Sequence, residues 1–217
     1  MNNKVLYVEE NEIHNELSSI RNLMERSSKF ISLSGLSGVL AGIYALIGAF
    51  LAYQIIYGSG GFFSYREYVA DDMSTGLTNL IQLVAIALVV LIASLITGVA
   101  LTIRKARQKG QKAWGSTSRQ LLFYMAVPLL TGGALMLILI SRGYFAIVAP
   151  ASLIFYGLAL INASNFTFKD VRYLGMCEVT LGLIAAALPG YGLLFWAVGF
   201  GILHIIYGSI MYLKYDR

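Results

Sequence analysis

Glu178 and His204 are the two ionisable side chains that lie well inside long apolar stretches of the chain. An imidazole gains and loses a proton near neutral pH, and a partly buried carboxylate can be tuned toward the same range. Such a pair can therefore bind and release protons. Titratable groups at such depth in a membrane are costly, so they usually face the interior of a helix bundle and find partners there.

Small residues surround both side chains at helical spacing. Steps of three and four residues around Glu178 reach Gly175, Gly182 and Ala185, and the same steps around His204 reach Ala197, Gly201 and Gly208. Small residues let membrane helices approach closely. Both side chains are therefore expected on helix faces that pack inside the protein.

A short turn at Pro189 and Gly190 joins the two stretches that carry Glu178 and His204. A connection this short makes the two helices antiparallel neighbours. Counted from the turn, the two residues differ in depth by about three residues, or about 4.5 Å. A direct or water-bridged contact is therefore a reasonable hypothesis. It has two interpretations, a polar clasp that fixes helix register at about 1 kcal/mol and a proton-linked site.

Other kinds of chemistry find little support in the sequence. Cys177 points about 100° away from Glu178 on a helix, which disfavours a Cys-Glu-His catalytic trio. A single cysteine excludes an intrachain disulfide, and one buried histidine cannot supply two axial haem ligands. Two residues are too few for a metal site unless two protomers combine their ligands. We therefore predict no cofactor, no bound metal and no catalytic residues, and an enzyme is the least favoured class.

The elements that position these residues follow from composition. Apolar residues make up 58% of the 217 residues and charged residues 12%, about half of the roughly 25% usual in a soluble domain. A helix needs about 20 mainly apolar residues to cross a membrane. Six stretches meet or nearly meet this length, at residues 30–57, 77–103, 121–140, 144–161, 171–188 and 191–213. The sequence predicts an all-α integral membrane protein with a six transmembrane helix bundle over residues 30–217.

The basic residues predict the orientation of this bundle. If both termini lie on one side, that side holds 14 of the 16 lysines and arginines, and the other side keeps Arg66 and Arg142. Basic residues in short flanking loops mark the cytoplasmic side, so both termini are expected there. The net charge of +5 thus reflects topology and does not indicate nucleic-acid binding. The basic loop at residues 104–119 is also suited to contact anionic lipid head groups.

An amphipathic pattern precedes the first span. Apolar residues recur at three- and four-residue steps among polar neighbours, at Ile13, Leu17, Ile20, Met24 and Ile31. This pattern predicts a cytoplasmic amphipathic helix over residues 1–29. It would lie on the membrane surface, continue into the first span, or dock a cytoplasmic protein partner.

A ridge of small residues, Ser34, Gly38 and Gly42, marks the first span. Spacing of this type favours close helix contact. It serves either packing within the bundle or formation of a homo-oligomer.

Two prolines and two glycines could bend the third and fourth spans. Pro128, Gly132 and Gly133 lie mid-way along the third predicted span, and Pro150 lies within the fourth. A proline inside a helix removes a backbone hydrogen bond and tends to kink the helix. These residues are the candidates for a hinge or a cavity.

Two classes of function remain. The favoured hypothesis is a translocator of a small solute or ion, linked to protons through Glu178 and His204. The alternative is a non-catalytic membrane subunit for signalling or scaffolding, which acts through its N-terminal helix and its basic loop.

Overall fold

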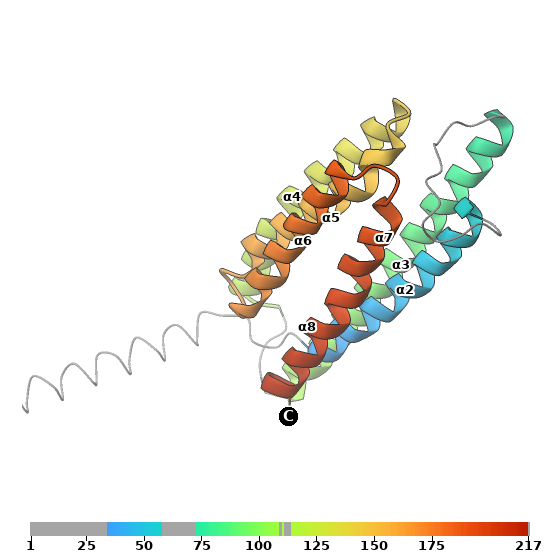
Figure 1. Ribbon diagram of the computed structural model, residues 1–217. Coiled ribbons are helices and arrows are strands. Elements are labelled where there is room, and N and C mark those ends of the chain that lie inside the picture. Colours follow the sequence, from blue (N-terminus) through green and yellow to red (C-terminus); the bar gives the residue numbers. More distant parts are fainter. Residues whose placement is uncertain (1–33, 58–72, 109, 111–113, 217) are drawn as a thin grey trace, which may run out of the picture.

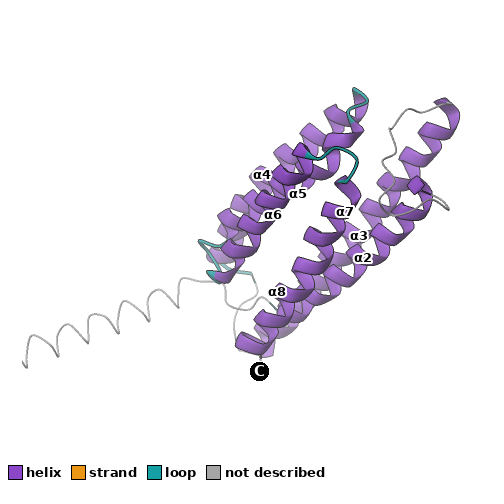
Figure 2. Cartoon of the chain, viewed as in Figure 1, coloured by secondary structure: helices purple, strands orange, loops and turns teal. Residues whose placement is uncertain are grey.

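The computed structural model describes residues 34–57, 73–108, 110 and 114–216, and every regular element among them is a helix (Figure 1, Figure 2). The predicted amphipathic helix at residues 1–29 lies outside the described residues.

The helices follow one another with short connections after residue 114. They are α2 (Gly35–Tyr57), α3 (Met73–Gln108), α4 (Ser116–Ser141), a 3-10 turn (Phe145–Ile147) that leads into α5 (Val148–Ala163), and α6 (Asp170–Ala187). The chain ends in one continuous rod, which we call the C-terminal helix. It consists of α7 (Gly192–Trp196), a π-helical segment (Ala197–Leu203), α8 (His204–Met211) and a second π-helical segment (Tyr212–Asp216).

Five helices of the described residues are long and apolar enough to cross a membrane. They cover Gly35–Tyr57, Thr78–Gln108, Ser116–Ser141, Phe145–Ala163 and Gly192–Tyr215. The helix α6 has 18 residues and carries three charged side chains, Asp170, Arg172 and Glu178. The prediction of an all-helical protein with several apolar, membrane-length helices is thus confirmed, whereas a sixth span and the amphipathic helix remain predictions.

The helices α3 and α4 extend beyond the apolar stretches that predicted them. The predicted spans covered residues 77–103 and 121–140, but α3 continues to Gln108 and α4 begins at Ser116. Hydropathy detects only the apolar part of a helix, and a helix that leaves the lipid can continue through polar residues. Arg104 and Lys105 therefore lie in the last turns of α3 rather than in a loop. Basic residues there complement the negative end of the helix dipole.

Two groups of helices lie side by side (Figure 1). In one group α5 packs between α4 and α6, and in the other α2 packs between α3 and the C-terminal helix. The two groups meet where the C-terminal helix packs against α5 and α6. The turn after α6 crosses from one group to the other.

Glycines bring the helices of each group close together. A Cβ atom added at Gly157 of α5 would lie 2.6 Å from the carbonyl oxygen of Gly175 of α6. In the other group, a Cβ added at Gly42 of α2 would lie 2.6 Å from the carbonyl oxygen of Gly201. Contacts this close are possible only without side chains, as the small-residue pattern predicts.

The outer faces of α3 and α4 are apolar and exposed. Val89 and Ile96 of α3 are 67% and 65% exposed, and Leu130 and Leu137 of α4 are 73% and 70% exposed. Exposed apolar surface on this scale suits contact with lipid chains.

Candidate functional site

Glu178 lies in the middle of α6, on the face that packs inside the molecule. The small residues Gly175, Gly182 and Ala185 of the same face are buried with it. The exposed fraction of Glu178 is 0%, and neither carboxylate oxygen has a hydrogen-bond partner. A buried polar atom without a partner costs about 1–3 kcal/mol, and more when it is charged. This cost suggests that Glu178 is kept for a reason other than stability.

His204 faces Glu178 from the C-terminal helix, at the first residue of α8. The ring is 6% exposed, and its Nδ1 atom lies 3.4 Å from Oε1 of Glu178. The structure thus brings together the two side chains that the sequence singles out. Two distributions of a shared proton are open to them, a neutral acid beside a neutral ring and a carboxylate beside an imidazolium.

Two further groups determine which ring nitrogen carries the proton. The carbonyl oxygen of Gly199 lies 3.0 Å from Nδ1 of His204. Because a carbonyl only accepts, Nδ1 must be the donor. The hydroxyl of Tyr156 lies 2.8 Å from Nε2, and it donates to Nε2 when the ring is neutral. The neutral ring therefore has both of its nitrogens satisfied without any help from Glu178.

The aromatic side chains Tyr156 and Phe200 hold the imidazole in place. Their ring centroids lie 5.4 Å and 6.0 Å from that of His204, and 5.0 Å from each other. Tyr156 comes from α5, so the site draws its side chains from three helices, α5, α6 and the C-terminal helix. Tyr156 is absent from the sequence-based candidates, because the chain has 14 tyrosines and nothing in the sequence distinguishes this one.

The π-helical segment Ala197–Leu203 supplies the glycine of the site. A Cβ atom added at Gly199 would lie 2.5 Å from Oε2 of Glu178 and 2.5 Å from a methyl group of Leu153. Glycine therefore lets the carboxyl group approach the backbone. Departures from α-helical geometry of this kind are rare and occur frequently at functional sites.

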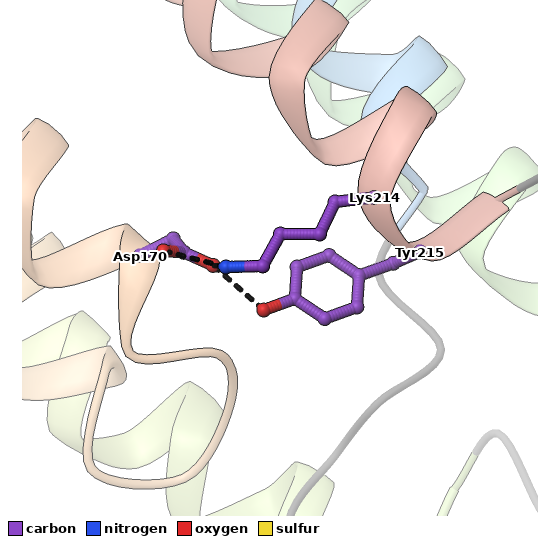
Figure 3. Close-up of polar contacts among 3 residues, drawn as sticks. All are labelled: Asp170, Lys214 and Tyr215. Atoms are coloured by element: carbon purple, nitrogen blue, oxygen red, sulfur yellow. Dashed lines mark hydrogen bonds and ion pairs between the residues drawn. The ribbon is translucent and has the colours of Figure 1, made fainter.

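A second polar cluster joins the same two helices near their ends (Figure 3). The Lys214 ammonium donates to Oδ2 of Asp170 at 2.9 Å, and the Tyr215 hydroxyl donates to the same oxygen at 2.7 Å. Asp170 lies outside the span predicted for residues 171–188. Partial burial raises the pKa of Asp170, but the hydrogen bonds from Tyr215 and Lys214 outweigh it and hold the pKa below its usual value. We call these three residues the end cluster.

The end cluster is absent from the sequence-based candidates, although a signal for it exists. Counting residues outward from the middle of the turn at Pro189 and Gly190 places Asp170 and Lys214 within about five residues, or about 7.5 Å, of each other along antiparallel helices. The same count places Glu178 and His204 within about three residues of each other in depth. Charged residues at helix ends attract less notice because water solvates them there.

The candidate hinge residues do not meet at the site. The helix α4 runs without interruption through Pro128, and the ring of Phe155 covers Gly132. A Cβ atom at Gly133 would meet nothing within 4 Å. Pro150 is the third residue of α5, in the first turn, where backbone N–H groups lack helical partners anyway. None of these positions creates an opening toward Glu178 in this conformation.

The described pockets lie elsewhere. One of about 10 Å³ is lined by Tyr53, Tyr57, Gly190, Tyr191, Leu193 and Leu194. A second, open one of about 440 Å³ is lined by Ser116, Arg119, Gln120, Phe123 and Tyr124. Neither of these two pockets includes Glu178 or His204, and Glu178 is 0% exposed, so its carboxyl group is closed off from solvent in this conformation.

The small-residue ridge of α2 contacts its own chain. A Cβ atom at Gly38 would lie 3.1 Å from Gly208, and Gly42 lies against Gly201. A homo-oligomer through Ser34, Gly38 and Gly42 stays a prediction, and it would require the C-terminal helix to move aside.

Among residues 34–57, 73–108 and 114–216, no group of three histidine, cysteine, aspartate or glutamate side chains is placed to hold a metal ion. Comparison of the chain with protein-family models, with curated proteins and with solved structures gives no match. The function must therefore be argued from the site.

Proposed function

We propose that this chain is a six-span membrane protein that moves a small solute or ion across the membrane, and that proton binding at Glu178 and His204 drives the movement. The observation that carries the proposal is the Glu178 carboxyl group, which is fully buried without a hydrogen-bond partner and lies 3.4 Å from a titratable ring. Intramembrane ionisable residues in such pairs commonly belong to proton relays.

The helix α6 is the sixth span in this proposal. Its 18 residues rise about 27 Å, close to the thickness of the hydrocarbon core. It packs along α5 through Gly157, Gly175 and Gly182. Its charged residues Asp170 and Arg172 lie in its first turn, at the level of the membrane surface. With six spans both termini lie on one side, and the excess of basic residues assigns that side to the cytoplasm.

The site also lies between two groups of helices, which supports a transport role. Glu178 and Tyr156 belong to the α4–α5–α6 group, and His204 belongs to the group of α2, α3 and the C-terminal helix. Carriers expose a central site alternately to either side by moving one bundle against another. A change of proton occupancy at this contact would alter the attraction between the two groups.

Flux measurements in proteoliposomes across a pH gradient test the proposal. We expect flux of at least one small ion or solute that follows the pH gradient, and we expect Glu178→Gln and His204→Ala each to lower it at least about tenfold. Cys177→Ala is the matched control, because Cys177 neighbours Glu178 in sequence and is exposed. Unchanged flux in both site variants would refute the proton-linked role.

A second candidate function is supported by the closed packing of the site. Glu178 is 0% exposed and neither pocket reaches it, which also suits a non-catalytic subunit for signalling or scaffolding. Such a subunit would contact a cytoplasmic protein partner through residues 1–29 and the basic segment. Deleting residues 1–28 would then abolish partner binding while the remaining helices stay folded, whereas proton-linked flux would survive the deletion if the chain is a carrier.

A further inference from the structure

The contact between α6 and the C-terminal helix joins the buried site to the end cluster. Along α6 the inward face runs from Asp170 to Glu178, and along the C-terminal helix it runs from Tyr215 to His204. The eight residues from Asp170 to Glu178 correspond to about 12 Å. A proton that travels between the membrane surface and Glu178 along this contact therefore needs one or two intermediate polar groups.

Tyr207 provides such a group. It lies one turn from His204 and packs against Leu160, Val171 and Leu174 in the apolar cluster between the two polar sites. Its hydroxyl oxygen is buried and has no hydrogen-bond partner. A buried hydroxyl without a partner destabilises the folded protein and calls for an explanation. Phenylalanine would fill the same space without that cost.

The opposite direction, from Glu178 toward the turn at Gly190, is apolar and tightly packed. Leu153 and Ala185 are 0% and 1% exposed. A Cβ atom at Gly182 would lie 2.9 Å from the carbonyl oxygen of Pro150. None of these residues carries a hydroxyl or charged group, and the Ser152 hydroxyl of α5 donates to the Ala149 carbonyl of its own helix at 2.7 Å.

The groups that face the site limit the possible routes. On α5 the group at the site is Tyr156. On the C-terminal helix it is His204, followed one turn away by Tyr207 in the adjoining apolar cluster. The helix α2 packs on another face of the C-terminal helix through glycines, and its Tyr44 hydroxyl lies 3.4 Å from the hydroxyl of Thr97 in α3. Tyr53, Tyr57 and Tyr191 lie at the Gly190 end, where the Tyr57 hydroxyl donates to the Gly190 carbonyl, whereas Tyr207 offers a buried hydroxyl without a hydrogen-bond partner on the Asp170 side.

We propose that protons reach Glu178 from the Asp170 end of the molecule and that the Tyr207 hydroxyl relays them. This inference rests on the proposed proton-linked function. In each transfer Tyr207 gives its hydroxyl proton toward the His204–Glu178 pair, directly or through one water, and takes a proton from the side of the end cluster. Tyr207 ends unchanged, Glu178 gains one proton and no electrons move. The side chain is a positioning and relay group, and it contacts no transported solute.

Time-resolved infrared spectroscopy on oriented vesicles tests the route. Vesicles captured through a tag on the C-terminus present the Asp170 end outward, and the uncaptured vesicles present the Gly190 end. After a rapid drop in external pH, the carboxyl band that Glu178→Gln removes should rise quickly only in captured vesicles. We expect Tyr207→Phe to slow this rise at least about tenfold.

Tyr212→Phe is the matched control, since it removes a hydroxyl from an exposed tyrosine of the same helix. A rise that is equally fast in Tyr207→Phe, or faster in the uncaptured vesicles, would overturn the route, and so would the absence of any titrating band. Thermal unfolding of Tyr207→Phe should occur at the wild-type temperature or above, because the variant loses an unpartnered hydroxyl. The infrared experiment follows protonation of Glu178 and requires no transported solute. A failure of the relay can therefore be distinguished from a failure of the flux assay.

Discussion

The two ring nitrogens of His204 form hydrogen bonds in opposite roles, one as a donor and the other as an acceptor. The Gly199 carbonyl only accepts, and the Tyr156 hydroxyl can donate. The neutral ring is therefore satisfied without Glu178, whose oxygens remain unpartnered. These hydrogen bonds argue against the interpretation in which Glu178 and His204 serve only to fix the register of their helices. In that role Glu178 would have to supply a hydrogen bond that the ring otherwise lacks.

The stabilities of two site variants distinguish these readings. Glu178→Gln should keep a free energy of unfolding within about 0.5 kcal/mol of wild type, or raise it, because it removes an acid that receives no hydrogen bond. His204→Ala should lower it by about 2–4 kcal/mol, since it leaves a cavity and deprives the Tyr156 hydroxyl of its acceptor. Denaturant unfolding in detergent measures both. Equal losses in the two variants would instead identify the pair as a stabilising clasp.

At the scale of the element, glycines determine how closely the helices approach. Gly157 and Gly175 place the backbones of α5 and α6 in contact, and Gly208 does the same where the C-terminal helix meets Val39 of α2. Positions on outer faces differ, because Gly98 and Gly133 meet nothing within 4 Å. The same residue type therefore serves packing at one position and has no visible packing role at another.

Alanine at two helical glycines should have effects of opposite sign. Gly157→Ala would place its Cβ atom 2.6 Å from a backbone oxygen of α6, so the helices must separate, at a cost of about 1–3 kcal/mol. Gly133→Ala meets no neighbour and should raise the free energy of unfolding by about 0.5–1 kcal/mol through helix propensity. The measurement is denaturant unfolding of each variant. A neutral Gly157→Ala variant would contradict the close contact of α5 with α6.

The sequence is informative about elements and depth, and much less so about rotation. The membrane-length helices follow from apolar runs, and the level of Glu178 and His204 follows from their distances to the turn at Gly190. Tyr156 cannot be predicted, because its approach depends on how α5 is rotated. The π-helical segment Ala197–Leu203 is equally hidden, since its apolar residues suit an ordinary helix. The place of Pro150 in the first turn of α5 is hidden as well, because an apolar run does not indicate where its helix begins.

At the scale of the whole molecule, polar contacts connect the two helix groups at three levels. The end cluster lies at one end, the His204 site lies in the middle, and at the other end the Tyr57 hydroxyl donates to the Gly190 carbonyl at 3.2 Å. The contacts at the two ends are more exposed than the His204 site, so changes in the solution affect them before they affect the buried site. A movement that separates the two groups at one of these levels must break the contact there.

Replacing Asp170 with asparagine should remove an acid-sensitive part of the stability. The Asp170 pKa is lowered in the folded state, so its contribution is complete above the unfolded-state value of 3.8 and is lost as pH falls through the lower folded-state pKa. Thermal unfolding followed from about pH 6 down to about pH 2 should therefore show a smaller decline in Asp170→Asn than in wild type. Tyr215→Phe should give an intermediate decline, because it removes one of the hydrogen bonds that lower this pKa. Asp216→Asn makes the same change in charge next to Tyr215 and serves as the control. Identical declines in Asp170→Asn and wild type would mean that the end cluster does not hold the two groups together.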